Sequence, residues 1–376
     1  MSMNYLFLAD AIFPDSMGGS HRYLYELVTR LANNNNVYVI VPNICNKNVI
    51  EKQGNLTIFR YTLSKNKIKK FFEYQNKPIK IIKKYLNNIK IDVVNSHWAL
   101  VSYKVYKYFS KKSAKLVHYM HGPIYEEYSI EMQQNNIVKN IFINKVKKIE
   151  IKNLNIVEKV FVASNYMKSK AINCFGVLEN KITIIPCGCD YEKFDLKKKK
   201  STNDIFNILT IRRIKKRMGL DLLIDAILLL KDKYSVQLSI GGKGDYLDEI
   251  KHKVDSLKIN NVNFLGFIPE KALVSYYQKA DLFVIPSLDL EGFGMVTLEA
   301  LSCGTPVVGT PVGGNIEILS KLDKELIAEE VSAKSLADAI SRFIDSNKKD
   351  PDYYRKFVID NFSWTKVVNM FEKETR

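Results

Sequence analysis

ADLFVIPSLDLEGFGMVTLEALSCGTPVVGTPVGGNIE occupies residues 280–317 of the chain. Its first apolar run ends at Ser287, a loop that contains Gly292 and Gly294 follows, and residues 295–303 have the composition of a short helix. A second apolar run and a second glycine-rich loop repeat this order. The succession of strand, loop and helix predicts neighbouring parallel strands with helices between them.

The same alternation runs through the whole chain and predicts an α/β protein with mainly parallel sheets. The first helix is expected over residues 21–33. Strands are expected at residues 5–8, 37–41, 57–60, 92–96, 115–120, 159–163, 182–185, 206–211, 237–241, 263–266, 282–285 and 306–309.

A length of 376 residues predicts two domains. The lysine-rich residues 195–204 have the composition of a linker, which places one domain at residues 1–195 and the other at 203–358. Residues 359–376 are expected to form a C-terminal helix with an apolar face that either domain could cover, the N-terminal one included. That face consists of Trp364, Val367, Val368 and Phe371.

The charge is strongly basic and unevenly distributed. The chain has 57 Lys and Arg against 40 Asp and Glu, net +17, and residues 1–190 hold 28 basic against 13 acidic residues. Phosphate, nucleic acid and anionic lipid are therefore candidate partners. No nucleic-acid recognition module is visible in the sequence, so we expect no nucleic-acid partner.

Cysteine usage and hydropathy indicate the compartment. The five cysteines have no paired CxxC spacing, which argues against a disulfide framework or a zinc knuckle and favours a reducing cytosol. No apolar run reaches the ~18 residues of a membrane span, and Asp10 and Asp15 do not suit a signal peptide. We expect a cytoplasmic protein, with a peripheral position on the inner face of the membrane as a further option.

Two carboxylates flank the start of the expected helix at residues 295–303. Unpaired N–H groups at a helix start suit a phosphate, and Glu291 and Glu299 suit sugar or ribose hydroxyls. Two glutamates eight positions apart are otherwise commonly two solvated side chains.

With this spacing, the Gly-Phe-Gly loop and the Cys-Gly-Thr-Pro-Val-Val strand, residues 280–317 resemble the donor-binding signature of retaining glycosyltransferases of family 4. The resemblance implies the GT-B architecture, which has two Rossmann-like lobes facing a cleft. It implies a catalytic role for Glu291. It also implies donor-binding roles for the loop and helix residues Gly292, Phe293, Gly294, Met295, Val296 and Glu299.

Further segments resemble the same family in the expected order. Gly18 and Gly19 match its glycine-pair loop, although an ordinary turn would look the same. His121 matches its active-site histidine. His97 and Trp98 are candidates for the acceptor side, with packing as the alternative for His97. His118 lies an odd number of residues from His121, so the two rings face opposite sides of a strand and are not expected to share a metal ion.

Residues 209–226 resemble the segment in which an arginine and a lysine hold the donor diphosphate. Arg213 falls on the family arginine and is assigned a catalytic role. The family lysine is replaced by Met218, and Arg217 and Lys216 are the candidates to substitute for it; we assign Arg217 to the donor site.

The resemblance implies transfer of a hexose from a nucleoside diphosphate sugar to a hydroxyl, with retention and without a metal ion or other cofactor. Saccharide and lipid-linked acceptors of polysaccharide, lipopolysaccharide or glycolipid assembly are all compatible. An epimerase or phosphorylase on the same scaffold is the alternative, but no pyridoxal-phosphate lysine motif is found.

Residues 68–86 combine lysines with apolar side chains, which is typical of a helix at an anionic membrane surface. A solvated helix whose apolar side faces its own domain is the alternative. Pro78 is expected to interrupt any long helix here.

Overall fold

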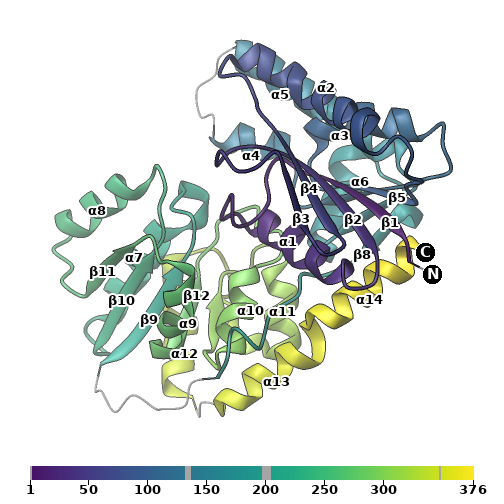
Figure 1. Ribbon diagram of the computed structural model, residues 1–376. Helices are drawn as coiled ribbons and strands as arrows, with labels where there is room; N and C mark the ends of the chain where they lie inside the picture. Colours follow the sequence, from purple (N-terminus) through teal and green to yellow (C-terminus); the bar gives the residue numbers. More distant parts are fainter. Residues whose placement is uncertain (1, 132–136, 197–204, 347–348) are drawn as a thin grey trace. The chain divides into compact units, whose positions relative to one another are not determined.

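A computed structural model describes residues 2–131, 137–196, 205–346 and 349–376. Most of the linker predicted at residues 195–204 lies outside these ranges. The chain forms two compact units (Figure 1). Unit 1 comprises Met1–Pro186 and Val367–Arg376, and unit 2 comprises Cys187–Lys366. Each unit contains a mainly parallel sheet with helices beside it, which confirms the predicted fold class.

Unit 1 has the strand order β3-β4-β2-β1-β5-β6-β7-β8, and only the β3–β4 pair is antiparallel in the described part of the chain. Its strands are β1 (Asn4–Leu8), β2 (Asn36–Pro42), β3 (Ile50–Gln53), β4 (Leu56–Tyr61), β5 (Val93–Ser96), β6 (Lys115–Met120), β7 (Lys159–Val162) and β8 (Ile182–Ile184). All but β3 were predicted. Edge strand β3 is mostly exposed, so its sequence lacks the apolar run that marks the buried strands.

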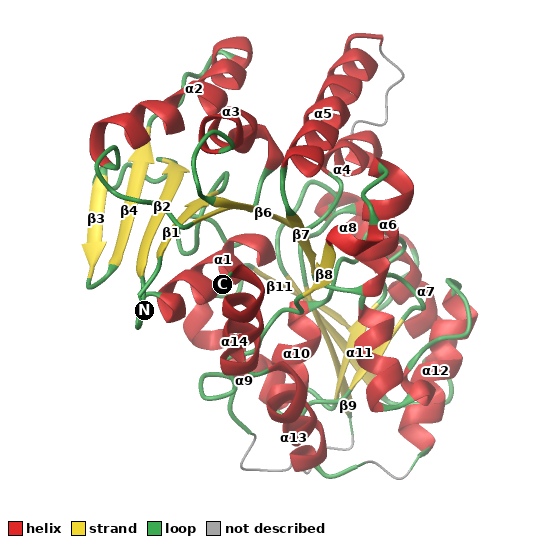
Figure 2. Ribbon diagram, turned by 90° about the vertical axis from the view of Figure 1, so that its right-hand side faces the viewer, coloured by secondary structure: helices red, strands yellow, loops and turns green. Residues whose placement is uncertain are grey.

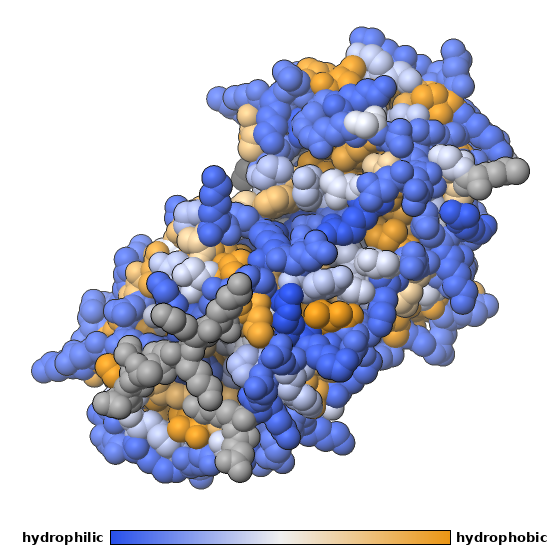
Figure 3. All heavy atoms as spheres, turned by 60° about the horizontal axis from the view of Figure 1, so that its bottom comes forward, coloured by the Kyte–Doolittle hydropathy of each residue, from blue (hydrophilic) through white to orange (hydrophobic). Residues whose placement is uncertain are grey.

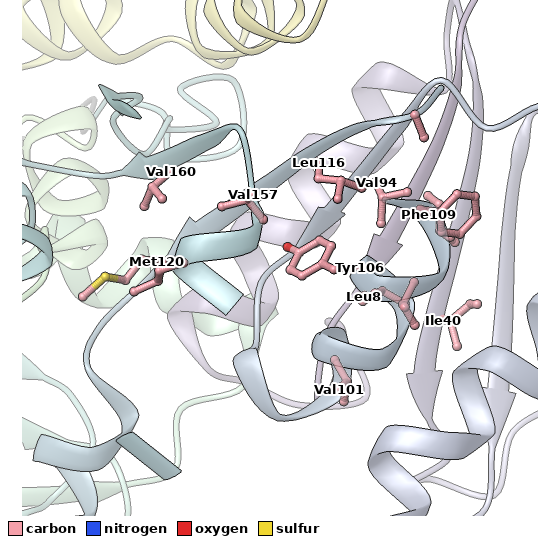
Figure 4. Close-up of a cluster of buried hydrophobic side chains, with 14 of the residues drawn as sticks. Leu8, Ile40, Val94, Val101, Tyr106, Phe109, Leu116, Met120, Val157 and Val160 are labelled. Carbon is pink, nitrogen blue, oxygen red and sulfur yellow. The ribbon is translucent and has the colours of Figure 1, made fainter. Parts of the chain in front are cut away.

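Helices cover both faces of this sheet (Figure 2). Those of unit 1 are α1 (Gly19–Leu31), α2 (Lys67–Tyr85), α3 (Ala99–Phe109), α4 (Ile124–Glu131), α5 (Ile137–Ile156), α6 (Asn165–Phe175), the 3-10 helix η1 (Glu179–Lys181) and most of α14 (Trp364–Thr375). A buried cluster joins the strands to α2, α3, α5 and α6, with Tyr106 and Phe109 contributed by α3 (Figure 4). On the opposite face Phe371 of α14 packs against Tyr5, Phe7 and Phe161.

The expectation that Pro78 interrupts the helix was wrong, because α2 continues through it from Lys67 to Tyr85. Neighbouring side chains hold the helix in place: Gln75 donates to the carbonyl of Leu100, and Tyr74 packs edge-on against Trp98 at 4.9 Å between ring centroids. Such tertiary contacts compensate for the one backbone hydrogen bond that proline cannot donate.

Unit 2 has five described strands in the order β11-β10-β9-β12-β13, and all neighbouring pairs are parallel. They are β9 (Phe206–Ile211), β10 (Val236–Gly241), β11 (Val262–Gly266), β12 (Leu282–Ile285) and β13 (Val307–Gly309), as predicted. The helices are α7 (Leu220–Leu230), α8 (Leu247–Ser256), α9 (Glu270–Lys279), α10 (Met295–Ser302), α11 (Asn315–Leu322), α12 (Ala333–Asp345), α13 (Pro351–Phe362), and the 3-10 helices η2 (Lys216–Met218) and η3 (Lys324–Leu326).

The surface shown in Figure 3 is mostly hydrophilic, with apolar side chains in small separate groups. Among the helices described, none combines the length and the apolar character that crossing a bilayer requires.

Candidate functional site

Each sheet has one position at which the direction of strand addition reverses. In unit 1 this position lies between β1 and β5, and in unit 2 it lies between β9 and β12. Ligands of open α/β sheets bind beyond the carboxyl ends of the strands at such a position. The predicted site residues lie in the segments that follow these four strands, except His121, which follows the neighbouring strand β6.

In unit 2 the carboxylate of Glu291 is held by two neighbours on one of its oxygens. Arg212 Nη2 lies 2.8 Å from Glu291 Oε2, and the Ser287 hydroxyl donates to the same oxygen at 2.9 Å. Arg212 also donates to Ser287 Oγ at 2.8 Å, which closes a triangle of contacts. Within the described ranges, both side-chain hydrogen bonds of this carboxylate involve Oε2, so Oε1 can accept a hydrogen bond from a ligand.

The backbone of Glu291 is fixed by the loop between β13 and α11. Its carbonyl accepts from Gly314 N at 2.8 Å. Gly313 has φ +67°, and a Cβ there would lie 2.0 Å from the Glu291 carbonyl oxygen. Only glycine allows the backbone to come this close to the Glu291 carbonyl. The glycine-rich loop after β13 therefore holds the glycine-rich loop after β12 in position.

The predicted donor-binding residues surround the start of α10. Gly294 precedes the helix with φ +95°. Gly292, Met295 and Val296 are half-buried, whereas Phe293 is buried and lies 5.9 Å from Phe362 between ring centroids.

Glu299 is buried within α10, one turn beyond the loop residues. The Tyr277 hydroxyl donates to its Oε2 at 2.8 Å. Burial, the larger cause, and the nearby Glu299 carboxylate, the second cause, raise the pKa of Tyr277 well above its ordinary value. The Tyr277 hydroxyl therefore keeps its proton and remains a hydrogen-bond donor.

The arginines after β9 have different surroundings. Arg213 is exposed, whereas Arg217 is buried and donates to the carbonyl of Leu290 at 3.1 Å in the donor loop. Lys216 is exposed. Met218, which stands in the place of the family lysine, has its sulfur 3.0 Å from Arg212 Nη2.

Sequence reasoning missed Arg212. Burial lowers the pKa of this guanidinium, and the Glu291 carboxylate opposes that effect. The signal that could have found Arg212 is the alternation of side chains at the end of β9. Because two adjacent residues there face opposite sides, Arg212 and Arg213 cannot both point the same way, and one of them faces the loop after β12.

In unit 1 Gly18 ends the loop after β1, and Gly19 is the first residue of α1. A Cβ on Gly18 would lie 2.8 Å from His21 Nδ1, so the imidazole packs directly against this glycine. His21 Nε2 in turn lies 3.2 Å from Asp10 Oδ1. The glycine-pair loop therefore has a histidine and a carboxylate beside it, neither of which was predicted as a site residue.

His97 and His121 follow the adjacent strands β5 and β6. His97 Nδ1 lies 2.8 Å from His121 Nε2, and the His97 ring stacks on Tyr119 with 5.3 Å between centroids and 5° between planes. Tyr23 meets His121 edge-on at 5.5 Å. His118 faces the other side of the sheet, where its Nδ1 lies 3.2 Å from the Tyr106 hydroxyl.

Trp98, the other acceptor-side candidate, is half-buried next to α2 through its contact with Tyr74. His97 is only 7% exposed, and its ring nitrogens lie beside Asn95 and His121. Among the described residues, no three His, Cys, Asp or Glu side chains are placed to hold a metal ion.

Two family models match consecutive parts of the chain. The model described as Glycosyltransferase Family 4 matches residues 17–193, and the model described as Glycosyl transferases group 1 matches residues 192–357. Together they cover nearly the whole chain.

Individual proteins agree with these matches. An uncharacterized glycosyltransferase of Methanocaldococcus jannaschii is 24% identical over 95% of this chain and 94% of its own length. A second one from that organism is 28% identical over 57% of this chain, and that match spans 60% of the relative. A GDP-mannose-dependent alpha-(1-6)-phosphatidylinositol monomannoside mannosyltransferase of Mycolicibacterium smegmatis is 26% identical over 56% of this chain and 60% of its own length.

Solved structures share the fold. Sucrose-phosphate synthase from Thermosynechococcus elongatus has a TM-score of 0.80 at 20% identity, with 98% of each chain covered. Anabaena HepE in complex with UDP and glucose has a TM-score of 0.75 at 16% identity, with 99% of each chain covered.

Proposed function

Because the chain belongs to glycosyltransferase family 4, whose members transfer sugars from nucleotide sugars, we propose that it moves a hexose from a nucleoside diphosphate sugar to an acceptor hydroxyl with retention of configuration. The observation that supports this most is the Glu291 carboxylate at the reversal point of unit 2. Arg212 and Ser287 hold its Oε2 and leave Oε1 for a sugar hydroxyl. A carboxylate fixed in this way accepts hydrogen bonds from hydroxyls without rearranging.

The nucleotide portion of the donor binds along α10. Glu299 takes the ribose hydroxyls. Residues 292–296, which span the loop end and the first turn of α10, surround the diphosphate at the helix start, where unpaired N–H groups and the helix dipole favour negative charge. Exposed Arg213 supplies the positive charge for the diphosphate. Buried Arg217 supports the donor loop through the Leu290 carbonyl.

Barrier lowering comes chiefly from stabilising the charge that develops on the departing diphosphate. Arg213 and the backbone amides near Gly294 perform this role, and the proposed reaction uses no metal ion or other cofactor. The leaving phosphate accepts the proton of the acceptor hydroxyl on the same face of the sugar, so no carboxylate nucleophile is required.

Unit 1 provides the acceptor-side residues. His121 contacts the transferred sugar, Gly18 and Gly19 allow close approach of substrate to the backbone, and Trp98 lies on the acceptor side. His97 acts on this side through His121, in agreement with its burial.

The acceptor is a saccharide or lipid-linked saccharide of cell-surface polysaccharide, lipopolysaccharide or glycolipid assembly. A relative named as a phosphatidylinositol monomannoside mannosyltransferase supports a lipid-linked acceptor. The exposed apolar side chains of α2 and α5 support binding to the cytoplasmic face of an anionic membrane: Ile68 and Phe72 are 73% and 55% exposed, and Ile137 and Ile141 are 79% and 63% exposed. Each pair is one helical turn apart, and Lys145 of α5 lies over the Phe71 ring of α2.

Activity measurements on site variants test the proposal. A panel of nucleoside diphosphate sugars is incubated with lipid-linked and free saccharide acceptors, and nucleoside diphosphate release and the anomeric configuration of the product are measured. Glu291→Gln and His121→Ala are expected to reduce turnover at least ~100-fold with the fold intact, because each removes a hydrogen-bonding partner of the sugar in the transition state.

Matched controls are Glu329→Gln and His252→Ala, which change exposed side chains of unit 2. Near-normal turnover in Glu291→Gln would remove the proposed role of this carboxylate. An inverted product anomer would exclude a retaining reaction.

A further inference from the structure

Asn95, His97, Tyr119 and His121 share one face of the unit 1 sheet. β5 and β6 pair in parallel with Asn95 opposite Val117, and alternate residues point to the same face. This register places His97 beside Tyr119 and brings His121, one step past the end of β6, within 5.0 Å of the His97 ring centroid. The rings of Tyr119 and Tyr23 pack against both imidazoles.

Three side chains form a continuous hydrogen-bonded chain on this face. Asn95 Nδ2 lies 3.3 Å from His97 Nε2, and His97 Nδ1 lies 2.8 Å from His121 Nε2. A neutral imidazole has one donor and one acceptor nitrogen, so the direction of the first hydrogen bond sets the direction of the second.

The amide nitrogen of Asn95 can only donate, which makes His97 Nε2 the acceptor. His97 then carries its proton on Nδ1 and donates it to His121 Nε2. Because His121 Nε2 accepts this hydrogen bond, the proton of the neutral His121 ring lies on Nδ1. His121 therefore presents an N–H donor on Nδ1, the nitrogen that His97 does not contact.

We propose that Asn95 and His97 are positioning residues that hold His121 in the tautomer with its proton on Nδ1. The proposal rests on the proposed function, in which His121 contacts the transferred sugar. His121 would then donate a hydrogen bond to a sugar oxygen, and the reverse tautomer would present an acceptor at the same place. Burial lowers the pKa of both rings, that of His121 to about 3, so both remain neutral near pH 7 and the donor–acceptor alternation holds.

Nitrogen-15 spectra of the unliganded full chain test the tautomer without any substrate. The chain has five histidines, and His121→Gln identifies the signals of His121. We expect the wild-type ring to show a protonated Nδ1 and an unprotonated Nε2. A wild-type His121 with its proton on Nε2 would overturn the proposal, and this measurement does not depend on the proposed function.

Asn95→Asp tests the direction of control. A carboxylate only accepts, so His97 would turn its proton to Nε2, His97 Nδ1 would become an acceptor, and the His121 proton would move to Nε2. The spectrum is recorded at about pH 9, where imidazolium is absent. Because the donated hydrogen bond is lost, kcat/KM is expected to fall roughly ten- to hundredfold. An unchanged His121 tautomer in Asn95→Asp would contradict the assignment.

The signals of His118 are the internal control in the same spectra. This histidine lies on the opposite face of the sheet next to Tyr106, and neither Asn95 nor His97 contacts it in the described hydrogen bonds. Unchanged His118 signals show that unit 1 is folded in the variant, so a switched His121 tautomer with native His118 signals supports the proposal.

Discussion

At the residue scale, neighbouring side chains of the same type have different chemistry because they face different sides of one strand. His118 and His121 are three positions apart, and the structure places them on opposite faces with different partners. Arg212 and Arg213 are adjacent, yet Arg212 holds Glu291 while Arg213 is exposed. Alternation along a strand explains both cases.

His118 makes unit 1 sensitive to acid. Burial lowers its pKa to about 4 from an unfolded value of 6.5. Above pH 6.5 the ring is neutral in both states, and as the pH falls from 6.5 towards 4 the unfolded chain binds the proton first, so stability is lost. The loss approaches about 1.4 kcal/mol per pH unit for this group.

Denaturant unfolding at about pH 7.5 and about pH 5 measures this effect. The wild type is expected to lose roughly 2 kcal/mol more than His118→Gln over this interval. His252→Gln, which changes an exposed histidine of α8, should retain the wild-type pH dependence. Equal pH dependence in the wild type and His118→Gln would show that His118 does not titrate in this way.

At the element scale, α2 combines a structural and a proposed docking role. Its buried side contacts α3, which explains why Pro78 does not end it, and its exposed side carries lysines around Ile68 and Phe72. The apolar periodicity of this segment is compatible with either a solvated or a membrane-bound helix.

Removing exposed lysines of α2 is expected to weaken binding to anionic vesicles. Lysines near an anionic leaflet contribute about 1 kcal/mol each, so Lys69→Ser, Lys70→Ser and Lys80→Ser together should lower the partition coefficient at least roughly tenfold. Sedimentation with vesicles that contain phosphatidylglycerol measures this, and vesicles of phosphatidylcholine alone should show little difference.

The matched control replaces three exposed lysines of unit 2, Lys251, Lys271 and Lys356, and keeps the same net charge change. An equal loss of binding in the control would indicate a nonspecific charge effect. Unchanged sedimentation of the α2 variant would end the docking proposal.

At the whole-molecule scale, the chain passes from unit 1 to unit 2 after Pro186 and returns to unit 1 after Lys366. Phe371 completes the core of unit 1 through aromatic contacts with β1 and β7, whereas Trp364 at the start of the same helix packs over Gly188 in unit 2. The last ten residues therefore belong to the fold of a unit whose other residues all precede Cys187.

Phe371→Ala is expected to destabilise unit 1 by about 3–5 kcal/mol, because it leaves a cavity at a fully buried aromatic position. The chain has two tryptophans, Trp98 in unit 1 and Trp364 in unit 2, so single-tryptophan variants report the unfolding of each unit by fluorescence.

The Trp98 transition is expected to move to lower denaturant and the Trp364 transition to stay in place. Met370→Ala, at a partly exposed position of α14, should move neither transition by more than a small amount. An unchanged Trp98 transition in Phe371→Ala would contradict the role of α14 in unit 1.

The sequence by itself determined the α/β class, the positions along the chain of all the described strands except β3, and the loops in which site residues are predicted. Strand periodicity and glycine spacing are local properties, and parallel strands bring their carboxyl ends to one edge of a sheet. Glu291, Glu299, Gly294 and His121 lie in these loops or at the helix that follows them, and their predicted roles come from the resemblance of these segments to the family signature.

Only the tertiary structure decided which side chains meet. Arg212 is 79 positions from Glu291, and His97 is 24 positions from His121. These contacts depend on strand register and on the packing of loops from different strands, which local periodicity does not contain. For the same reason, the hydrogen-bonded series of Asn95, His97 and His121 follows from long-range packing. The place of α14 in unit 1 does so too, because local sequence does not show which sheet covers its apolar face.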